Sequence, residues 1–291
     1  MYKNKINNTD KSIYQCSGEK TGLLENVTVS ENKYLGGNNY LMKIFSENVI
    51  KQVTNPKAGQ FYMLKLKNQI RILRRPVSLH SVNSEKGEVE FLYKVTGKGT
   101  EEISMLQKGN ILNIQGPLGK GFDICEKSEN IIIIGGGIGL APLKQLIKEL
   151  LKYKENKNII FIAGGRNKEA INVLNGFPSD RRLYTVICTD DGSSGEKLNI
   201  AEMLEKVLKN GKNPDMIYSC GPDRALKIIN DIANRKNIPS QISMEERMAC
   251  GVGACVGCSV ETVLGMKRVC HEGPVFYSSV FSQNRGEVNV N

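Results

Sequence analysis

The arrangement of hydrophobic and polar positions changes near residue 123. Before that point, short apolar-rich runs are separated by Gly, Asn and charged turns, and they predict strands at 24–29, 40–45, 60–66, 77–82, 89–95 and 111–114. Short strands at regular spacing are typical of an antiparallel barrel or sandwich. We therefore expect an all-β domain over residues 23–122.

After residue 123, apolar strands alternate with amphipathic helices. Strands are expected at 131–134, 159–163, 184–189, 216–220 and 241–244, and helices at 141–154, 167–174, 200–209 and 223–236. This alternation predicts βαβ units, and hence a parallel sheet with helices on both faces. The expected α/β domain spans residues 123–238, and residues 239–291 form a small cysteine-rich third part.

Length and composition agree with this division. A chain of 291 residues, 40% hydrophobic and 24% charged, suits a globular protein of two domains with a small appendage. No run approaches the length of a membrane span, and residues 1–22, an extension to which we assign no function, lack the apolar stretch of a secretory signal. We expect a cytoplasmic protein without a membrane partner.

The formal net charge of +10 leaves two interpretations open. One is a basic surface for nucleic acid, and the other is a Lys-rich composition with charges spread over solvated faces. The second is favoured because the sequence contains no tight block of Lys and Arg. No nucleic-acid partner is therefore expected.

Four of the eight cysteines, Cys250, Cys255, Cys258 and Cys270, lie close together with the spacing C-x4-C-x2-C-x11-C. Three thiolates in one short loop and a more distant fourth are typical of plant-type [2Fe–2S] proteins. The small residues between them let backbone N–H groups approach sulfur. Structural zinc is the alternative, and it would suit a different class, a basic nucleic-acid-binding protein.

A glycine run follows the first strand of the expected parallel sheet. Gly135, Gly136, Gly137 and Gly139 precede a helix, where bare amides and the helix N-terminus can cradle a phosphate. The run does not match the dinucleotide fingerprint G-x-G-x-x-G, and a tight turn is the alternative.

Two further segments end strands of the same sheet. Cys220, Gly221 and Pro222 follow one strand, and Asp190 follows another. Because the carboxyl ends of parallel strands form one edge of a sheet, where such folds bind ligands, we predict a nucleotide site there. Asp190 is expected either to contact ribose hydroxyls or to cap the next element.

The β domain carries its own candidate ligand groups. Arg75 stands beside a strand, where it can hold a pyrophosphate, and Ser78 can donate to a ring nitrogen. Tyr93 and Lys94 offer an aromatic face and a charge, and Gly99 and Thr100 belong to a second Gly-rich segment. A surface ion pair is the alternative for Arg75.

These motifs, in this order, resemble the ferredoxin–NADP reductase superfamily, in which a flavin-binding barrel precedes a nucleotide-binding domain. Residues 58–61 and 75–78 are similar to its barrel motifs, and residues 135–142 and 220–222 to its pyridine-nucleotide motifs. Residues 245–255 and 268–276 resemble more closely the electron-transfer subunits of NAD-linked dihydroorotate dehydrogenase.

The resemblance implies a role for each matching residue. FAD would be held by Arg75, Pro76, Val77, Ser78, Leu92, Tyr93, Lys94, Gly99 and Thr100, with Arg75 on the pyrophosphate and Ser78 facing the ring system. Many members carry Tyr where Val77 stands, so Tyr93 would supply the aromatic face. NAD would be held by Gly135, Gly136, Gly137, Gly139, Asp190, Gly221 and Pro222, with Cys220 as the catalytic residue beside the nicotinamide.

The resemblance also implies a function. Electrons from the FMN of a partner dihydroorotate dehydrogenase subunit would pass through the [2Fe–2S] cluster and FAD to NAD+, in pyrimidine biosynthesis, within a complex of two copies of each subunit. FAD is needed because a cluster moves single electrons and nicotinamide takes a hydride. The alternative of the same build is the small subunit of a ferredoxin-dependent NAD(P) oxidoreductase or of a sulfide dehydrogenase.

Overall fold

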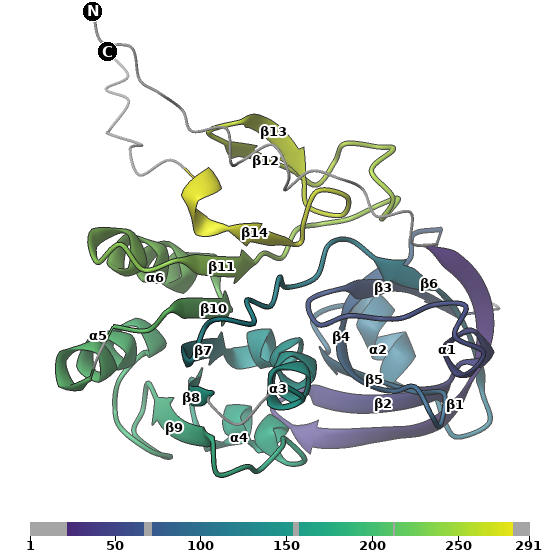
Figure 1. Ribbon diagram of the computed structural model, residues 1–291. Coiled ribbons are helices and arrows are strands. Elements are labelled where there is room, and N and C mark those ends of the chain that lie inside the picture. Colours follow the sequence, from purple (N-terminus) through teal and green to yellow (C-terminus); the bar gives the residue numbers. More distant parts are fainter. Residues whose placement is uncertain (1–21, 67–71, 154–156, 212, 282–291) are drawn as a thin grey trace, which may run out of the picture.

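The computed structural model describes residues 22–66, 72–153, 157–211 and 213–281. Six strands close into an antiparallel barrel in the order β1-β2-β5-β4-β3-β6 (Figure 1). They are β1 (Leu23–Gly36), β2 (Asn39–Phe45), β3 (Phe61–Leu66), β4 (Arg75–Asn83), β5 (Glu88–Lys94) and β6 (Ile111–Leu118). The predicted strands of the β domain are confirmed, and of the two predicted architectures the barrel is correct.

Alternation along the barrel strands explains its closure around one core. On β2, Met42 and Ile44 are fully buried while their neighbours are more exposed, because successive side chains point to opposite faces. Phe91 of β5 packs its ring against Tyr62 of β3 inside the barrel, with ring centroids 5.3 Å apart. The two short helices of this domain, α1 (Glu47–Ile50) and α2 (Lys98–Ser104), were not expected from the sequence.

The second domain is a six-stranded sheet in the order β14-β11-β10-β7-β8-β9. Five strands are parallel: β7 (Asn130–Gly136), β8 (Asn158–Gly165), β9 (Leu183–Thr189), β10 (Met216–Cys220) and β11 (Ser240–Ser243). Its helices are α3 (Leu143–Leu151), α4 (Lys168–Ile171), α5 (Ile200–Asn210) and α6 (Asp223–Arg235). None of the described helices is long and apolar enough to cross a membrane.

The run of apolar residues in β7 serves both faces of this sheet. Ile131 and Ile133 join the core under α3, whereas Ile132 and Ile134 join the core under α5 and α6. A strand buried on both faces needs such a continuous apolar run, as parallel sheets typically show. In Figure 1, α5 and α6 cover one side of the sheet, and α3 lies between the sheet and the barrel.

Two predicted helices differ from the structure. The helix expected at 141–154 is preceded by a 3-10 turn, η2 (Gly137–Leu140), and α3 ends at Leu151. The end is fixed by Arg182, whose guanidinium donates to the carbonyl oxygens of Leu151 and Tyr153 at 2.9 and 3.0 Å. The helix expected at 167–174 consists of α4 followed by the 3-10 turn η3 (Asn172–Leu174).

The cysteine-rich segment leaves β11 and returns to the same sheet. It forms a hairpin of β12 (Ser259–Thr262) and β13 (Gly265–Arg268), then β14 (Val275–Tyr277), which pairs antiparallel with β11, and a last 3-10 turn, η4 (Ser278–Val280). Its apolar side chains pack on the barrel: Cys258, Val269, Cys270 and Phe276 share a core with Phe61, Met63 and Leu118. The segment therefore rests on both larger domains (Figure 1).

Candidate functional site

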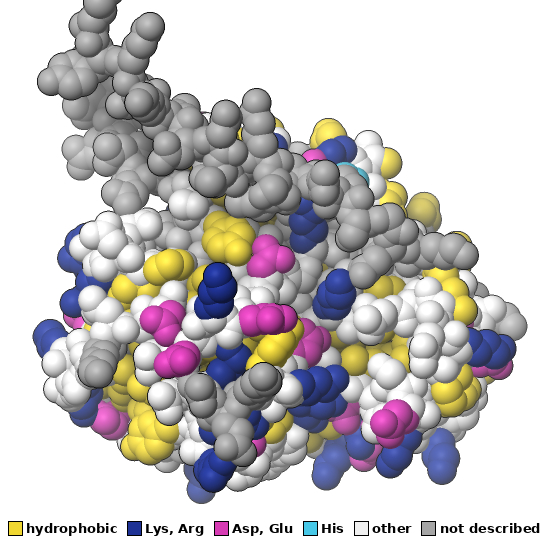
Figure 2. All heavy atoms as spheres, in the orientation of Figure 1, with side chains coloured by type: hydrophobic (Ala, Val, Ile, Leu, Met, Phe, Trp, Pro, Cys, Tyr) yellow, Lys and Arg dark blue, Asp and Glu magenta, His cyan; other side chains and the backbone are white. Residues whose placement is uncertain are grey.

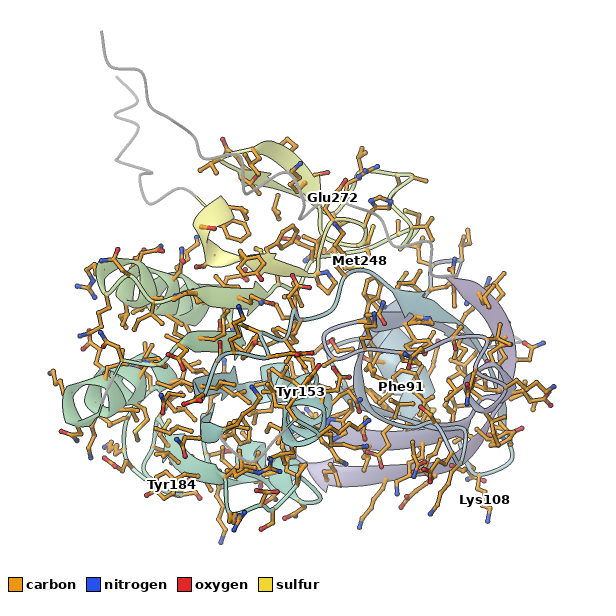
Figure 3. The ribbon with its side chains drawn as sticks, in the orientation of Figure 1. Phe91, Lys108, Tyr153, Tyr184, Met248 and Glu272 are labelled. Atoms are coloured by element: carbon orange, nitrogen blue, oxygen red, sulfur yellow. The ribbon has the colours of Figure 1, made fainter. Side chains whose placement is uncertain are left out.

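A pocket of about 210 Å³ lies where the three parts of the chain meet. The barrel contributes Phe61, Pro76, Val77, Ser78, Leu92, Tyr93, Lys94, Thr96 and Thr100, the turn after β7 contributes Ile138 and Ala141, and the third part contributes Ser243, Met244, Glu245, Glu246, Met248 and Pro274. Figure 3 labels Met248 where the cysteine-rich segment passes over the barrel. One cavity is thus bounded by every part of the molecule.

The barrel wall of this pocket holds most residues that were predicted to bind FAD: Pro76, Val77, Ser78, Leu92, Tyr93, Lys94 and Thr100. The Tyr93 hydroxyl donates to Asn32 Oδ1 at 3.0 Å, and the ring stacks on Tyr40 with centroids 5.7 Å apart. Burial raises the pKa of Tyr93, so the phenol stays neutral. Tyr93 therefore offers a fixed, neutral aromatic face to the cavity.

Arg75 precedes the lining residue Pro76 but is not itself one of the residues that line the pocket. Its Nη1 donates to the backbone oxygens of Leu73 and Arg74 at 2.7 and 3.2 Å, and its guanidinium covers Gly99, where a Cβ would stand 1.8 Å from Nε. The neighbouring Arg74 instead donates to Asn113 Oδ1 at 2.6 Å within the barrel. Of the two arginines, Arg75 is therefore the one gathered with Gly99 and Thr100.

The glycines after β7 have different surroundings. A Cβ at Gly135 would meet Leu140 at 2.5 Å, and one at Gly139 would meet the Cys220 backbone at 2.6 Å. A Cβ at Gly136 would stand 2.9 Å from the Ile200 side chain. Gly137, with φ +58°, borders open space. Close packing thus accounts for three of the glycines, and Gly137 leaves room beside the backbone; Ile138 and Ala141, rather than the glycines, line the pocket.

Cys220 lies next to this turn, but it is not one of the residues that line the pocket. Cys220 is paired with Gly135 on one side and with Ser243 on the other. Burial, and then the negative charge of Glu245, raise the pKa of its thiol, so Cys220 is a neutral group. Gly221 lies against Gly136, with 3.3 Å between a Cβ built there and the Gly136 nitrogen, and Pro222 also touches Gly136.

Asp190 lies farther along the same sheet edge. It follows β9, which is separated from β7 by β8, and its backbone N–H donates to Gly165 O at 3.0 Å. Asp190 is exposed and does not belong to the described lining of the pocket. Its distance from Cys220 along the edge suits an extended ligand that lies across the carboxyl ends of several strands.

Glu245 is a residue of the pocket that was not predicted as a site residue. It lines the pocket, and part of its side chain is exposed to solvent. Burial, with the nearby charge of Asp223, raises the pKa of the Glu245 carboxyl. Its position directly before the cysteine motif was the sequence signal that could have identified it. Phe61 and Thr96 also line the pocket without having been predicted as site residues, and their signal was their position beside the predicted FAD segments.

The four clustered cysteines lie in the loop after β11 and at the end of the β13 hairpin. Backbone N–H groups point at their sulfur atoms: Gly253 N to Cys270 Sγ at 3.1 Å, and Val252 N and Cys255 N to Cys250 Sγ and Cys270 N to Cys258 Sγ at 3.4 Å. Amides directed at sulfur stabilise thiolate ligands of an iron–sulfur cluster. Although no three metal-binding side chains of the described residues converge into a preformed site, this donor set fits such a cluster.

Two of these thiols have opposite electrostatic surroundings. Burial disfavours the Cys250 thiolate, but the backbone N–H groups of Cys255 and Val252 outweigh it and lower the Cys250 pKa. Burial and the adjacent Cys258 thiol raise the Cys270 pKa. The loop therefore favours a thiolate at Cys250, which is less buried than Cys270.

An ion pair fixes the shape of the cysteine loop. Arg268 Nη2 and Nε bond to the Glu272 carboxylate at 2.5 and 3.1 Å, and Nη1 donates to Gly253 O at 2.9 Å. The Arg268 guanidinium holds the pKa of Glu272 well below its usual range. Gly253 is thus fixed at its carbonyl by Arg268, while its N–H points at Cys270 Sγ. Figure 3 labels Glu272 in this segment.

Family models assign a ligand to each part of the chain. A model described as the oxidoreductase FAD-binding domain matches residues 27–122, and one for the oxidoreductase NAD-binding domain matches residues 133–231. The iron–sulfur cluster binding domain of dihydroorotate dehydrogenase B matches residues 245–280. The predicted cofactors FAD, NAD and iron–sulfur are confirmed at the level of these domains, and the roles of single residues stay predictions.

Barrel, parallel sheet and cysteine segment around one pocket define an oxidoreductase that combines a flavin, a nicotinamide nucleotide and an iron–sulfur cluster. The chain is 37% identical over 227 residues to the dihydroorotate dehydrogenase B (NAD(+)) electron transfer subunit of Caldanaerobacter subterraneus subsp. tengcongensis, covering 77% of this chain and 86% of that one. It is 35% identical over 266 residues to that of Enterococcus faecalis, covering 88% and 97%. The chain belongs to this family of electron transfer subunits.

Solved structures share the same architecture. An NADH-dependent reduced ferredoxin-NADP oxidoreductase, described for flavin-based electron bifurcation, aligns with a TM-score of 0.78 and 26% identity over 88% of this chain and 89% of that chain. A ferredoxin NADP+ reductase from Neisseria gonorrhoeae aligns with a TM-score of 0.61 and 15% identity over 73% and 91%. The predicted fold class is confirmed.

Proposed function

We propose that this chain transfers electrons from the FMN of a dihydroorotate dehydrogenase catalytic subunit, through a [2Fe–2S] cluster and FAD, to NAD+ in pyrimidine biosynthesis. The observation that carries the proposal is a pocket bounded jointly by barrel, nucleotide-side turn and cysteine-rich segment. FAD exchanges single electrons with a cluster and a hydride with nicotinamide, which is why the three sites must meet. The proposed parts are residues 23–122, 123–238 and 239–291, with 1–22 as an extension.

The residues of the chain divide the work of binding and orientation. Arg75 and Thr100 bind the pyrophosphate of FAD, because cations and hydroxyls recognise phosphate oxygens. Ser78 and Tyr93 orient the ring system from the barrel wall. Gly137 would leave room for the nicotinamide nucleotide, and Cys220 would contribute a neutral thiol beside the same turn.

The cysteine-rich segment is the proposed contact with the catalytic subunit. Apolar side chains at the cysteine loop and the β12–β13 hairpin are exposed: Val252 43%, Val256 61%, Leu264 55% and Met266 63%. Exposed apolar groups gathered on one segment mark protein interfaces. A short gap between cluster and partner flavin also favours this face, and we propose a complex with two copies of each subunit.

The charged side chains on one face of the molecule agree with the expectation of no nucleic-acid partner. On the face shown in Figure 2, Lys and Arg side chains are scattered and alternate with Asp and Glu. We place the protein in the cytoplasm, where thiols such as the free Cys125 and Cys188 stay reduced.

The decisive experiment compares the chain alone with the chain reconstituted with its FMN subunit. Alone, it should reduce a dye with NADH but should not oxidise dihydroorotate; with the catalytic subunit, dihydroorotate should reduce NAD+. Dihydroorotate oxidation by the chain alone, or no NAD+ reduction by the reconstituted complex, would contradict the proposal.

The likeness to the NADH-dependent reduced ferredoxin-NADP oxidoreductase favours one second candidate. In it, the chain would be the small subunit of a ferredoxin-dependent NAD(P) oxidoreductase or of a sulfide dehydrogenase. Reduction of NADP+ by ferredoxin in a complex with a different large subunit, together with inactivity toward dihydroorotate, would select this candidate.

A further inference from the structure

Helix α3 meets the barrel through polar side chains. Lys144 Nζ donates to Glu90 Oε2 at 2.7 Å, and Lys148 Nζ donates to Ser81 Oγ and to Val82 O, both at 2.8 Å. Gln145 Oε1 accepts from Val82 N at 3.0 Å, and Glu149 Oε1 accepts from Ala58 N at 2.9 Å. These bonds hold the α/β domain against the barrel, with α3 lying between them in Figure 1. They do not by themselves determine the position of the turn before α3, which comprises η2 and Ala141.

A β-bulge in the barrel points one residue toward that turn. In the β4–β5 pair, Leu79 faces Phe91 and Ser81 faces Glu90, so His80 is the additional residue between two regular pairs. A bulge releases its extra residue from the alternation of the strand and redirects its side chain. His80 consequently leaves the barrel face and enters the seam between the domains.

His80 bonds there to the end of the nucleotide-side turn. Its Nδ1 lies 2.7 Å from the carbonyl oxygen of Ala141. The residue is 1% exposed, and its ring packs edge-to-face on Phe177 with centroids 5.6 Å apart. Since a carbonyl can only accept, Nδ1 carries the proton. The imidazole is thus a donor held in one orientation.

The bond joins a lining residue of the pocket, Ala141, to the barrel strand that carries another, Ser78. Ser78, two residues before His80 on β4, lines the barrel wall, and Ala141 lines the opposite wall together with Ile138. We propose that His80 is a positioning residue, which sets the gap between the flavin-side wall and the nucleotide-side turn and so aligns nicotinamide with flavin. This inference rests on the proposed function, because only hydride transfer across the pocket requires that gap to be fixed.

The consequence is a specific kinetic pattern. A displacement of about 1 Å from the reactive geometry can slow a reaction about a hundredfold. Nucleotide contacts farther along the sheet edge are unaffected by the bond, so loss of the donor should lower kcat and leave KM for NADH nearly unchanged.

The test uses two His80 variants of the full chain and one matched control. His80→Leu fills the space of the imidazole but removes the hydrogen-bond donor to Ala141 O. His80→Asn keeps a donor, because its amide nitrogen can take the place of Nδ1. Ser81→Ala removes a neighbouring bond from β4 to α3 that does not touch the turn. FAD content, NADH–dye turnover and amide hydrogen exchange of residues 136–145 are measured for each protein.

With FAD content unchanged, His80→Leu should lower kcat at least about tenfold, keep KM within about threefold and speed exchange of the turn. His80→Asn should restore both, and Ser81→Ala should resemble wild type. Wild-type exchange and kcat in His80→Leu, or an equal loss in Ser81→Ala, would overturn the proposal. If wild type itself does not reduce dye with NADH, the proposed function fails, while unchanged exchange in His80→Leu separately refutes the role of His80.

Discussion

The α/β domain buries two groups of apolar side chains, one on each face of its sheet, whereas the cysteine-rich segment buries few of its own. In the α/β domain, β7 alone places Ile131 and Ile133 in one core and Ile132 and Ile134 in the other. The segment contributes mainly Val269, Phe276 and two cysteines to a core completed by barrel residues. The α/β domain is therefore stabilised by its own packing, whereas the cysteine-rich segment depends on packing against the barrel.

This difference shows which interactions must stabilise each part. A segment with a small core usually needs metal ligation or another crosslink to hold its shape. Here backbone N–H groups already point at the thiols, and the Arg268–Glu272 pair fixes the carbonyl of Gly253 in the same loop. We infer that cluster binding completes the fold of the segment, while the α/β domain is stable without it.

The largest expected effect comes from Cys255→Ser. Loss of one of four thiolate ligands should abolish the iron–sulfur absorbance and the EPR signal of the reduced protein, and should make residues 245–281 sensitive to protease. FAD should remain, because its pocket residues lie mainly on the barrel. Cys125→Ser, at an exposed thiol outside the loop, is the control. A full complement of iron and sulfide in Cys255→Ser would refute the ligand assignment.

Ile133→Ala tests the other half of the comparison. Ile133 is fully buried between Phe161 of β8 and Tyr218 of β10, and removal of such a side chain costs about 2–5 kcal/mol of unfolding free energy. Urea denaturation measures the loss, with Tyr184→Ala at a 70% exposed edge position as control, where about 0.5 kcal/mol or less is expected. The cluster spectrum of the folded variant should be normal; selective loss of the cluster would break the comparison.

Acid should weaken the seam between barrel and α/β domain. Burial and the charges of Lys144 and Lys148 outweigh the Ala141 bond and the attraction of Glu90, and they lower the pKa of His80 to about 4. Because the unfolded chain binds the proton near pH 6.5 and the folded chain only near 4, His80 lowers stability as pH falls through this window, by about 3 kcal/mol in total.

The difference in unfolding free energy between wild type and His80→Asn, measured from pH 7 to pH 4, isolates this contribution. Glu90 and Lys43 are present in both proteins, so their titration largely cancels. Parallel pH profiles of the two proteins would show that His80 is not held neutral in the seam.

The smallest of these effects concerns Arg75. A charge-assisted hydrogen bond contributes about 1.5–3 kcal/mol, so Arg75→Ala should weaken FAD binding roughly tenfold to hundredfold. FAD retention through dilution is the measurement, and the exposed Lys108, labelled in Figure 3, provides the control variant Lys108→Ala. The cluster should be unaffected, since its loop depends on other residues. FAD retention equal to that of the control would exclude Arg75 as a phosphate contact.

Most regular elements followed from periodicity. The barrel strands and the strands of the parallel sheet lie where alternation and apolar runs predicted them, with β1 longer than expected and α3 shorter. The helices α1 and α2 and the strands β12 to β14 escaped prediction because they span only three to seven residues in turn-rich or polar stretches. In so short a window, neither the helical nor the strand period can be recognised.

The sequence by itself determined the features that depend on neighbouring residues: strand and helix periods, the glycine run, and the spacing of Cys250, Cys255 and Cys258 in one loop. Only the tertiary structure decided which distant groups meet. It placed Arg75 over Gly99, Cys220 between Gly135 and Ser243, and Glu245 in the lining of the pocket. It also joined His80 to Ala141, 61 residues apart, because a bulge and a domain interface, unlike a period, leave no repeating pattern along the chain.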